Sequence, residues 1–375
     1  MATAVQPLAL PSPTRPRRAA AVRHLGPNWY ASVMGTAIVA TAGTGLPYAA
    51  RVPALRTACA AVWALSLALL VTLLVARALH WIHHRDQARA HLLDHAMAPF
   101  YGCLAMALLA VGGGSLVVGR DWIGAGAALA LDGVLYTTGT LIGVAAAVAV
   151  PYLMIVRHRV EPGQASPVWL LPLVPPMVAA AQGPLLVPHL PAGQPRETLL
   201  LACYAMFGMS LLATLVMLPL ILARLLTKGP LPPALAPALF LVLGPLGQSV
   251  TAVAATANAA DGVVPAPYAR GLGVLALVYG VPVIGFALLW LALSAVLTVR
   301  ARRQGMRFSM TWWAFTFPVG TCVTGAEALA RRTGLVAVDV LATGLFVLLA
   351  TAWAVAAPAT GRGVVSGELL AAPRR

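Results

Sequence analysis

Three carboxylates fall within or beside long apolar stretches of the sequence, where an ionised side chain is costly. Asp132 lies inside one apolar segment, and Glu327 and Asp339 lie near the ends of two others. Carboxyl groups at membrane depth commonly carry protons along transport pathways. The three residues are therefore candidates for proton coupling, with helix-end or interhelical hydrogen bonding as the alternative role.

A histidine cluster begins His80-x-x-His83-His84 and continues His91-x-x-x-His95. Imidazoles at such spacings can share a helix face and bind metal, as in the histidine boxes of membrane di-iron desaturases. Those enzymes need a further box downstream, and the sequence has none. A membrane-bound di-iron oxidoreductase that uses His80 to His95 is therefore the alternative function. We expect instead a polar cytoplasmic loop, with no metal and no other cofactor.

Glycine and proline interrupt every second apolar segment, and broken helices expose backbone N–H groups that can bind anions. Hydroxyl groups would add weak contacts from Ser32, Thr36, Ser249, Thr316 and Thr321. Because no basic residue lies at the centre of an apolar segment, we expect a weakly held anion. The candidate pore-lining residues at these helix breaks are Gly35, Thr36, Gly113, Pro176, Gly244, Pro245, Gln248, Ser249, Pro318 and Gly320.

Composition indicates which elements must position these residues. Of the 375 residues, 60% are hydrophobic and 9% are charged, whereas roughly a quarter are charged in soluble domains. A helix needs about 20 apolar residues to cross a bilayer, which predicts an all-α integral membrane protein with ten transmembrane helices. The segments are 27–46, 54–77, 96–118, 124–156, 168–189, 198–223, 235–259, 271–299, 310–330 and 335–357.

The predicted domain organisation is one ten-helix transmembrane domain, 26–358, between cytoplasmic tails at 1–25 and 359–375. The chain has 25 Lys and Arg against 10 Asp and Glu. Most of the basic residues fall on one side if both termini are cytoplasmic, so the excess indicates orientation in the plasma membrane. The expected partner is the lipid bilayer and not nucleic acid. Without a GxxxxGK[ST] phosphate loop or a Ser/His/Asp arrangement, we expect no enzyme activity.

Short loops between the segments require antiparallel neighbours, which gives five helix hairpins. The odd-numbered segments carry Gly or Pro near their middles, as in Gly112-Gly113-Gly114 and Gly244-Pro245. The even-numbered segments are smoother, apart from Gly280 and Pro282 in the eighth. Broken helices are tolerated at membrane depth where they line a cavity. We therefore expect five inner helices around a pathway and five outer helices that face lipid.

Three stretches resemble the tellurite-resistance/dicarboxylate transporter family, which includes plant slow-type anion channels, yeast malate permeases and fungal sulfite pumps. They read GPNWYASVMGT from residue 26, GPLGQS from residue 244 and WWAFTFPVGT from residue 312. The likeness extends over essentially the whole chain. It implies ten helices arranged as five hairpins in a quasi-fivefold ring around a central pore.

The resemblance also implies a gate, an assembly and a substrate class. A phenylalanine on the ninth helix would occlude the pore; this is Phe317 by position in the motif, with Phe315 as the fallback. An aromatic ring beside a proline kink can plug a narrow pore and move aside by a rotamer change. The family commonly forms homotrimers. Its substrates are anions, either a C4-dicarboxylate such as malate or a small inorganic anion such as chloride, nitrate or sulfite. Channel and proton-coupled carrier both remain open.

Overall fold

The computed structural model describes residues 23–158, 161 and 163–371, so most of the predicted N-terminal tail and the last four residues lie outside it. Within these ranges every regular element is a helix, which confirms the all-α prediction. The main α-helices are α2 (Tyr30–Gly45), α3 (Pro53–His83), α4 (Arg85–Leu93), α5 (Tyr101–Gly114), α7 (Ala125–Val156), α8 (Pro175–Gln182), α9 (Gln194–Lys228), α10 (Leu243–Ala259), α11 (Ala266–Arg303), α12 (Phe317–Thr333) and α13 (Val336–Val365).

Seven helical stretches in the described part of the chain are long and apolar enough to cross a membrane. They are Pro53–His83, Ala98–Ile123, Ala125–Val156, Gln194–Lys228, Pro233–Ala259, Ala266–Arg303 and Val336–Val365. The other three predicted segments contain α2, α8 and α12, which have 16, 8 and 17 residues. Each is shorter than the roughly 20 residues of a regular span, because 3-10 turns interrupt the helix.

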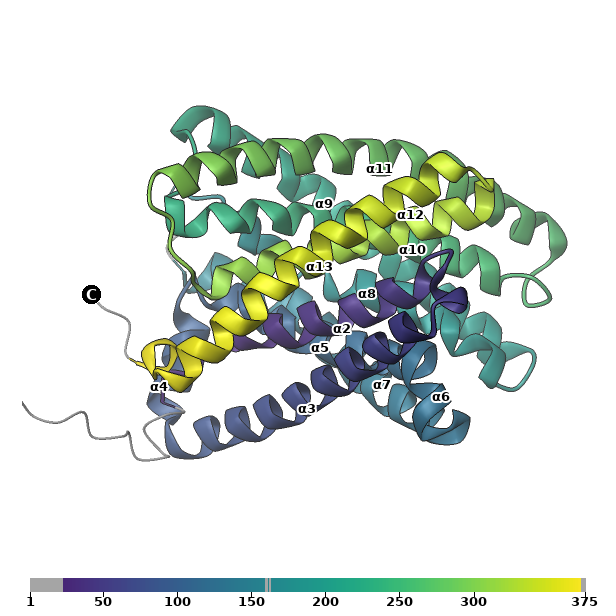
Figure 1. The fold of residues 1–375 in the computed structure, drawn as a ribbon, viewed down its shortest axis with the longest axis horizontal. Coiled ribbons are helices and arrows are strands. Elements are labelled where there is room, and N and C mark those ends of the chain that lie inside the picture. The colour runs from purple at the N-terminus through teal and green to yellow at the C-terminus, as the bar shows by residue number, and fades with distance from the viewer. Residues whose placement is uncertain (1–22, 159–160, 162, 372–375) are drawn as a thin grey trace, which may run out of the picture.

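Five of the seven spans form the outside of the molecule. In α3, α7, α9, α11 and α13 only 22% to 33% of the most apolar 18 residues are buried. Their exposed side chains are nevertheless apolar, for example Ile155 and Leu226, which are 83% and 77% exposed. A helix that is apolar on its exposed face belongs in lipid. In Figure 1, α11 and α3 run along opposite edges of the bundle.

The remaining helices lie inside. Buried residues make up 83% of the corresponding part of Ala98–Ile123, which contains α5, and 89% of that of Pro233–Ala259, which contains α10. Every residue from Tyr30 to Ala40 of α2 is buried. The inner helices contact one another in a closed series: α2 packs on α5, α5 on α8, α8 on α10, α10 on α12, and α12 on α2. The alternation of Gly- and Pro-rich segments in the sequence therefore coincides with burial.

Prolines explain how the inner helices begin. Four of them are entered through 3-10 helices with proline in the first turn: η1 (Pro27–Trp29), η3 (Ala98–Phe100), η5 (Pro167–Leu170) and η8 (Pro233–Val242). Proline fits a first turn because its missing N–H would have no helical partner there. The fifth, α12, follows η9 (Met310–Phe315) and has Pro318 in its first turn. After α5 the helix widens into a π-helical segment, η4 (Ser115–Gly119).

Two boundaries differ from the sequence-based expectation. The α13 helix continues to Val365, so the start of the predicted C-terminal tail at residue 359 lies inside a helix. The predicted histidine loop is helical, because His80 and His83 lie in the last turn of α3 and His91 lies in α4. Helix length is not limited by the bilayer at either extension, because each continues a helix that is already long enough to cross it.

Candidate functional site

A cavity of about 450 Å³ lies between the inner helices at the C-terminal ends of α2 and α12. We call it the wide cavity. Its lining includes Ile38, Thr41, Thr44 and Gly45 of α2, Val117 of η4, Ala181 and Gln182 of α8, Gln248, Thr251 and Asn258 of α10, and Thr324, Glu327 and Arg331 of α12. The cavity meets solvent at Asn258 and Arg331, which are exposed. Residues from all five inner spans thus surround one space.

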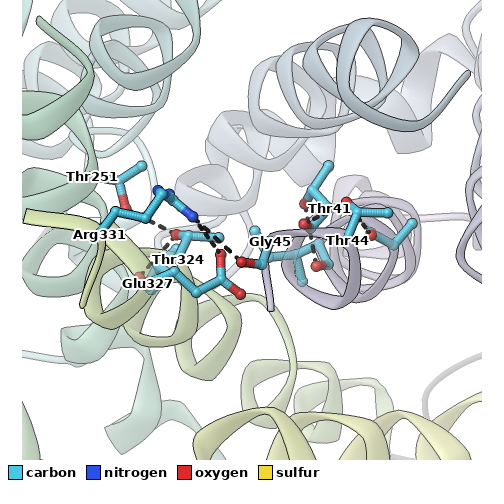
Figure 2. Close-up of polar contacts among 10 residues, drawn as sticks. Thr41, Thr44, Gly45, Thr251, Thr324, Glu327 and Arg331 are labelled. Atoms are coloured by element: carbon cyan, nitrogen blue, oxygen red, sulfur yellow. Dashed lines mark hydrogen bonds and ion pairs between the residues drawn. The ribbon is translucent and has the colours of Figure 1, made fainter. Parts of the chain in front are cut away.

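One ion pair stands in the wide cavity. The Arg331 Nη1 atom lies 3.9 Å from Glu327 Oε2 and donates a 3.4 Å hydrogen bond to the Gly45 carbonyl oxygen, as Figure 2 shows. The Glu327 side chain is only 3% exposed, whereas that of Arg331 is 60% exposed. The other carboxylate oxygen, Oε1, has no hydrogen-bond partner. The four-residue spacing brings both side chains onto one face of α12.

Neutral polar groups complete the lining. The Thr251 and Thr324 hydroxyls form a 2.9 Å hydrogen bond that joins α10 to α12. Thr41 and Thr44 donate to carbonyls of their own helix and face this pair across the close-up in Figure 2. Gln248 is 2% exposed, and its Oε1 atom has no hydrogen-bond partner. A buried amide that lacks a partner is rare in folded proteins, so it marks a position where a ligand or water can bind.

A second space, the narrow cavity, lies toward the N-terminal ends of the same five spans. Its volume is about 20 Å³, which is room for roughly one water molecule. The lining is almost wholly apolar and includes Met34, Phe100, Leu171, Leu241 and Ala314. The inner helices therefore enclose a wide polar space at one end and a tight apolar one at the other.

The stretch between the two cavities contains Phe317 and Gly244. Along the chain, Phe317 begins α12 three residues after Ala314, which lies in η9 and lines the narrow cavity. Thr324 of the wide cavity follows Phe317 by seven residues and lies on the same face of α12. On η8 and α10, Gly244 is likewise three residues after Leu241. Phe317 is 2% exposed, and a methyl group at Gly244 would meet no neighbouring segment within 4 Å.

The other predicted helix-break residues mostly serve helix packing. A side chain at Gly35 would overlap Thr316, one at Gly113 would overlap Gln182, and one at Gly320 would overlap Ile38. These glycines permit the close crossings of α2 with η9 and α12, and of α5 with α8. The three predicted prolines are buried in the first turns of their helices; they are Pro176 in α8, Pro245 in α10 and Pro318 in α12.

The predicted hydroxyl ligands are bonded to protein groups. Thr36 donates to Ser32 O at 2.7 Å and accepts from Trp353 Nε1 at 3.1 Å. Ser249 donates to Leu246 O at 2.7 Å and accepts from the Tyr279 hydroxyl at 2.8 Å. The hydroxyls of Ser32, Thr316 and Thr321 also donate to carbonyls within three residues. None of the five residues lines the wide or the narrow cavity.

Of the three candidate proton carriers, Glu327 alone lines one of the two cavities. Asp132 is fully buried in α7 against α5, near Gly112, and neither of its oxygens has a hydrogen-bond partner. Asp339 lies in the first turn of α13 and is half-buried. The second gate candidate, Phe315, packs edge-on against Phe240 with ring centroids 4.8 Å apart.

Sequence reasoning missed Arg331, Asn258 and the threonines of the wide cavity. One signal was present, because Arg331 follows Glu327 by four residues, the spacing of a helical ion pair. The threonines had no such signal. Whether a hydroxyl faces a cavity depends on the rotation of its helix, and the inner helices are apolar on every side, so periodicity does not reveal it.

The histidine cluster is a packing contact. The rings of His80 and His91 stack with centroids 5.5 Å apart and planes 6° from parallel, which fastens α4 to the end of α3. Nearby, the buried Arg77 donates to Leu25 O at 2.6 Å. No group of three or more His, Cys, Asp or Glu side chains among the described residues is placed to hold a metal ion. The di-iron alternative therefore has no support.

Long apolar helices that enclose a polar cavity and a constriction define a multi-pass membrane transport protein. The sequence profile of one family matches residues 24–360, and the chain belongs to that family, the voltage-dependent anion channel family. The family resemblance seen in the sequence motifs is thereby confirmed. Membership supports anion transport, with a small anion as substrate, and not an enzymatic activity.

Individual relatives agree with the family. An uncharacterized transporter of Methanocaldococcus jannaschii is 27% identical over 350 residues, which is 93% of this chain and 96% of the relative. A second uncharacterized transporter of that organism is 26% identical over 350 residues, 93% and 97% of the two chains. A sulfite efflux pump of Arthroderma otae is 26% identical over 339 residues, 89% of each chain.

Proposed function

We propose that this protein moves small inorganic oxyanions, with sulfite as the first candidate, across the plasma membrane along a central path between its inner helices. One observation carries the proposal: a polar cavity and an apolar constriction lie toward opposite ends of the same five spans. Two further points support the substrate. Relatives include sulfite efflux pumps. Among the described residues, Arg331 is the single basic residue that lines the wide cavity, whereas a dicarboxylate such as malate suits a pair of cations.

The architecture that goes with this function is ten transmembrane helices, paired into five hairpins around a quasi-fivefold pore. The closed series of contacts among α2, α5, α8, α10 and α12 supports it, as does the alternation of buried and exposed spans. With both termini in the cytoplasm, the wide cavity faces outward and the narrow cavity faces the cytoplasm. A homotrimer remains part of the proposal, carried over from the family resemblance.

Phe317 is the proposed gate. Its position along the chain, between residues of the narrow and the wide cavity, supports this role. Phe315 is the weaker candidate because its ring packs against Phe240 and Trp312. Between channel and proton-coupled carrier, the presence of Glu327 in the wide cavity favours coupling to protons. Asp132 and Asp339 line neither cavity, so we propose packing roles for them.

Anion flux into proteoliposomes at a clamped potential tests the proposal, with sulfite, nitrate, chloride and malate compared with and without a pH gradient. We expect sulfite and nitrate to enter and malate to be excluded. Malate uptake without sulfite uptake would replace the proposed substrate, and the absence of flux for all four anions would refute transport by this path.

The gate is tested in the same assay with Phe317→Ala and the matched variant Phe315→Ala, two residues away. Phe317→Ala should raise the anion flux because it removes the ring between the two cavities. Phe315→Ala should leave the flux unchanged after correction for the amount of folded protein. The reverse result would move the gate to Phe315, and unchanged flux in both variants would remove the aromatic gate from the mechanism.

A further inference from the structure

A buried carboxylate in an anion path needs an explanation. Glu327 lines the wide cavity and is 3% exposed, so water does little to weaken its repulsion of an incoming anion. Its Oε2 atom lies near Arg331, but Oε1 has no hydrogen-bond partner. An ionised Glu327 would therefore oppose the function that the cavity serves, unless its charge is neutralised.

Arg331 neutralises Glu327 only loosely. Its contacts with Glu327 Oε2, at 3.9 Å, and with Gly45 O, at 3.4 Å, are both long. A guanidinium group has five N–H donors, and the Arg331 side chain is 60% exposed at the mouth of the cavity. The next residue differs: Arg332 Nη2 donates to Asn258 Oδ1 at 2.7 Å and to Ala254 O at 3.3 Å. Arg331 is thus the basic residue that is free to change partners.

The surroundings of Glu327 leave Arg331 as its main charged partner. The titratable groups that act on it in the described part of the chain are Arg331, on its own helix, and the Cys59 thiol of α3. The facing residue of α2 is Gly45, whose lack of a side chain leaves room for the carboxylate. On the α10 side the lining is neutral. A negative charge from outside therefore competes with Glu327 for Arg331.

We propose that the wide cavity contains an oxyanion site in which Arg331 binds the anion and Glu327 competes for Arg331, so that Glu327 takes up one proton for each anion bound. This rests on the proposed function for the identity of the ligand. In the empty site Arg331 pairs with the carboxylate. When an anion binds the guanidinium, Glu327 loses its counter-charge and accepts a proton that enters from the bulk solution through the mouth of the cavity. Charge balances, because one negative charge and one positive charge enter together.

The chemistry of the lining favours a monovalent oxyanion. A guanidinium fork binds two oxygens of one anion at once, which a single-atom halide cannot match. The Gln248 amide, whose oxygen has no partner, and the Thr251–Thr324 hydroxyl pair offer neutral groups across the same cavity. With Glu327 protonated, Arg331 leaves one positive charge in the cavity, which equals the charge of one monovalent anion.

Proton uptake during nitrate binding tests this inference, because the charge of nitrate does not change over the pH range of the measurement. Nitrate is added to purified protein in weakly buffered detergent solution with a pH indicator. We expect the wild-type protein to take up close to one proton per chain at saturation. Its affinity for nitrate should rise as pH falls, by up to about tenfold per pH unit for one linked proton.

Four variants separate the roles. Glu327→Gln preserves shape, so it should bind nitrate with an affinity independent of pH and without proton uptake. Arg331→Gln should lose nitrate binding, and Arg331→Lys should bind but lose the preference for nitrate over chloride. The control Arg51→Gln removes an equal charge from the exposed turn after α2 and should behave like the wild type.

Each outcome decides something. Nitrate binding without proton uptake in the wild type, proton uptake that persists in Glu327→Gln, or no nitrate binding at all would overturn the site. If nitrate crosses the membrane without proton uptake, the site is wrong and the proposed function stands. If nitrate binds with proton uptake but no anion crosses, the site stands and the proposed function fails.

Discussion

Two glycines of α10 give the sharpest test of where the path runs. A methyl group at Gly244 would meet no neighbouring segment within 4 Å, whereas one at Gly247 would overlap the backbone of Thr321 and Cys322 at the α10–α12 crossing. The same substitution three residues away on one helix should therefore have different effects. Gly244→Ala enters open space, and Gly247→Ala forces two inner helices apart.

The expected changes in stability follow from helix propensity, which favours Ala over Gly, and from steric overlap, which opposes it. Replacing Gly by Ala within a helix stabilises by about 1 kcal/mol, but Gly244 precedes Pro245, and a Cβ there clashes with the proline ring. We expect these effects to cancel, which leaves Gly244→Ala within about 1 kcal/mol of the wild type. At Gly247 the overlapping atoms are backbone and have no rotamer to adopt. Overpacking costs roughly 1–3 kcal/mol, so Gly247→Ala should destabilise by about 2 kcal/mol.

Thermal unfolding of purified protein in detergent measures the change in stability, and nitrate flux per folded molecule measures the change in transport. We expect Gly244→Ala to unfold at nearly the wild-type temperature but to conduct less. The methyl group enters open space at a position that lies, along the chain, between Leu241 of the narrow cavity and Gln248 of the wide cavity. Gly247→Ala should unfold at a lower temperature. Equal destabilisation in both variants would refute the packing argument, and wild-type flux in Gly244→Ala would remove Gly244 from the path.

Two further predictions concern helix α4 and the α2–α12 crossing. Burial, and to a lesser extent the charges of Arg77 and His80, lower the pKa of His91 to about 4 from its ordinary value of 6.5. Protonation of His91 therefore favours the state in which α4 is detached from α3. The contact between α4 and α3 should be complete above pH 6.5 and weaken as the pH falls toward 4. Hydrogen exchange in α4 at pH 7 and pH 5, corrected for intrinsic rates, measures this, and His91→Phe should abolish the difference. Gly320→Ala should destabilise the protein by roughly 1–3 kcal/mol, because the added methyl group overlaps Ile38. In a double-mutant cycle, the added change Ile38→Ala should recover much of that loss. Simple additivity of the two changes would contradict the contact.

In the described part of the chain, seven of the ten predicted segments coincide with helical stretches long and apolar enough to cross a membrane. They were predictable because the bilayer imposes a minimum length on a regular crossing helix. The sequence also separated inner from outer helices, since broken backbone such as that around Pro175 and Gly183 is tolerated only inside the bundle. The site was less predictable. Glu327 was found because a carboxylate in an apolar segment is conspicuous, but so was Asp132, which lies between α7 and α5 and lines neither cavity.

Rotation of the inner helices accounts for most of what was missed. Thr36 and Thr41 both lie in α2, yet Thr41 lines the wide cavity while Thr36 bonds to Trp353 of α13. In an ordinary amphipathic helix, polarity would reveal which face meets water. The inner helices are apolar all round, so this signal is absent, and packing alone decides which hydroxyl an anion can reach.

The pairing of a wide polar cavity with a narrow apolar one has an electrical consequence. In the proposed orientation, solution ions that enter the wide cavity hold it near the potential of the outer compartment. The membrane voltage then drops mainly over the stretch around Phe317 and Met34. One charge that crosses the full voltage gains or loses about 2.3 kcal/mol per 100 mV. In the proposed path, an anion that passes this stretch experiences nearly all of that energy there, so the shape of the cavities sets where along the path the membrane voltage acts on the anion.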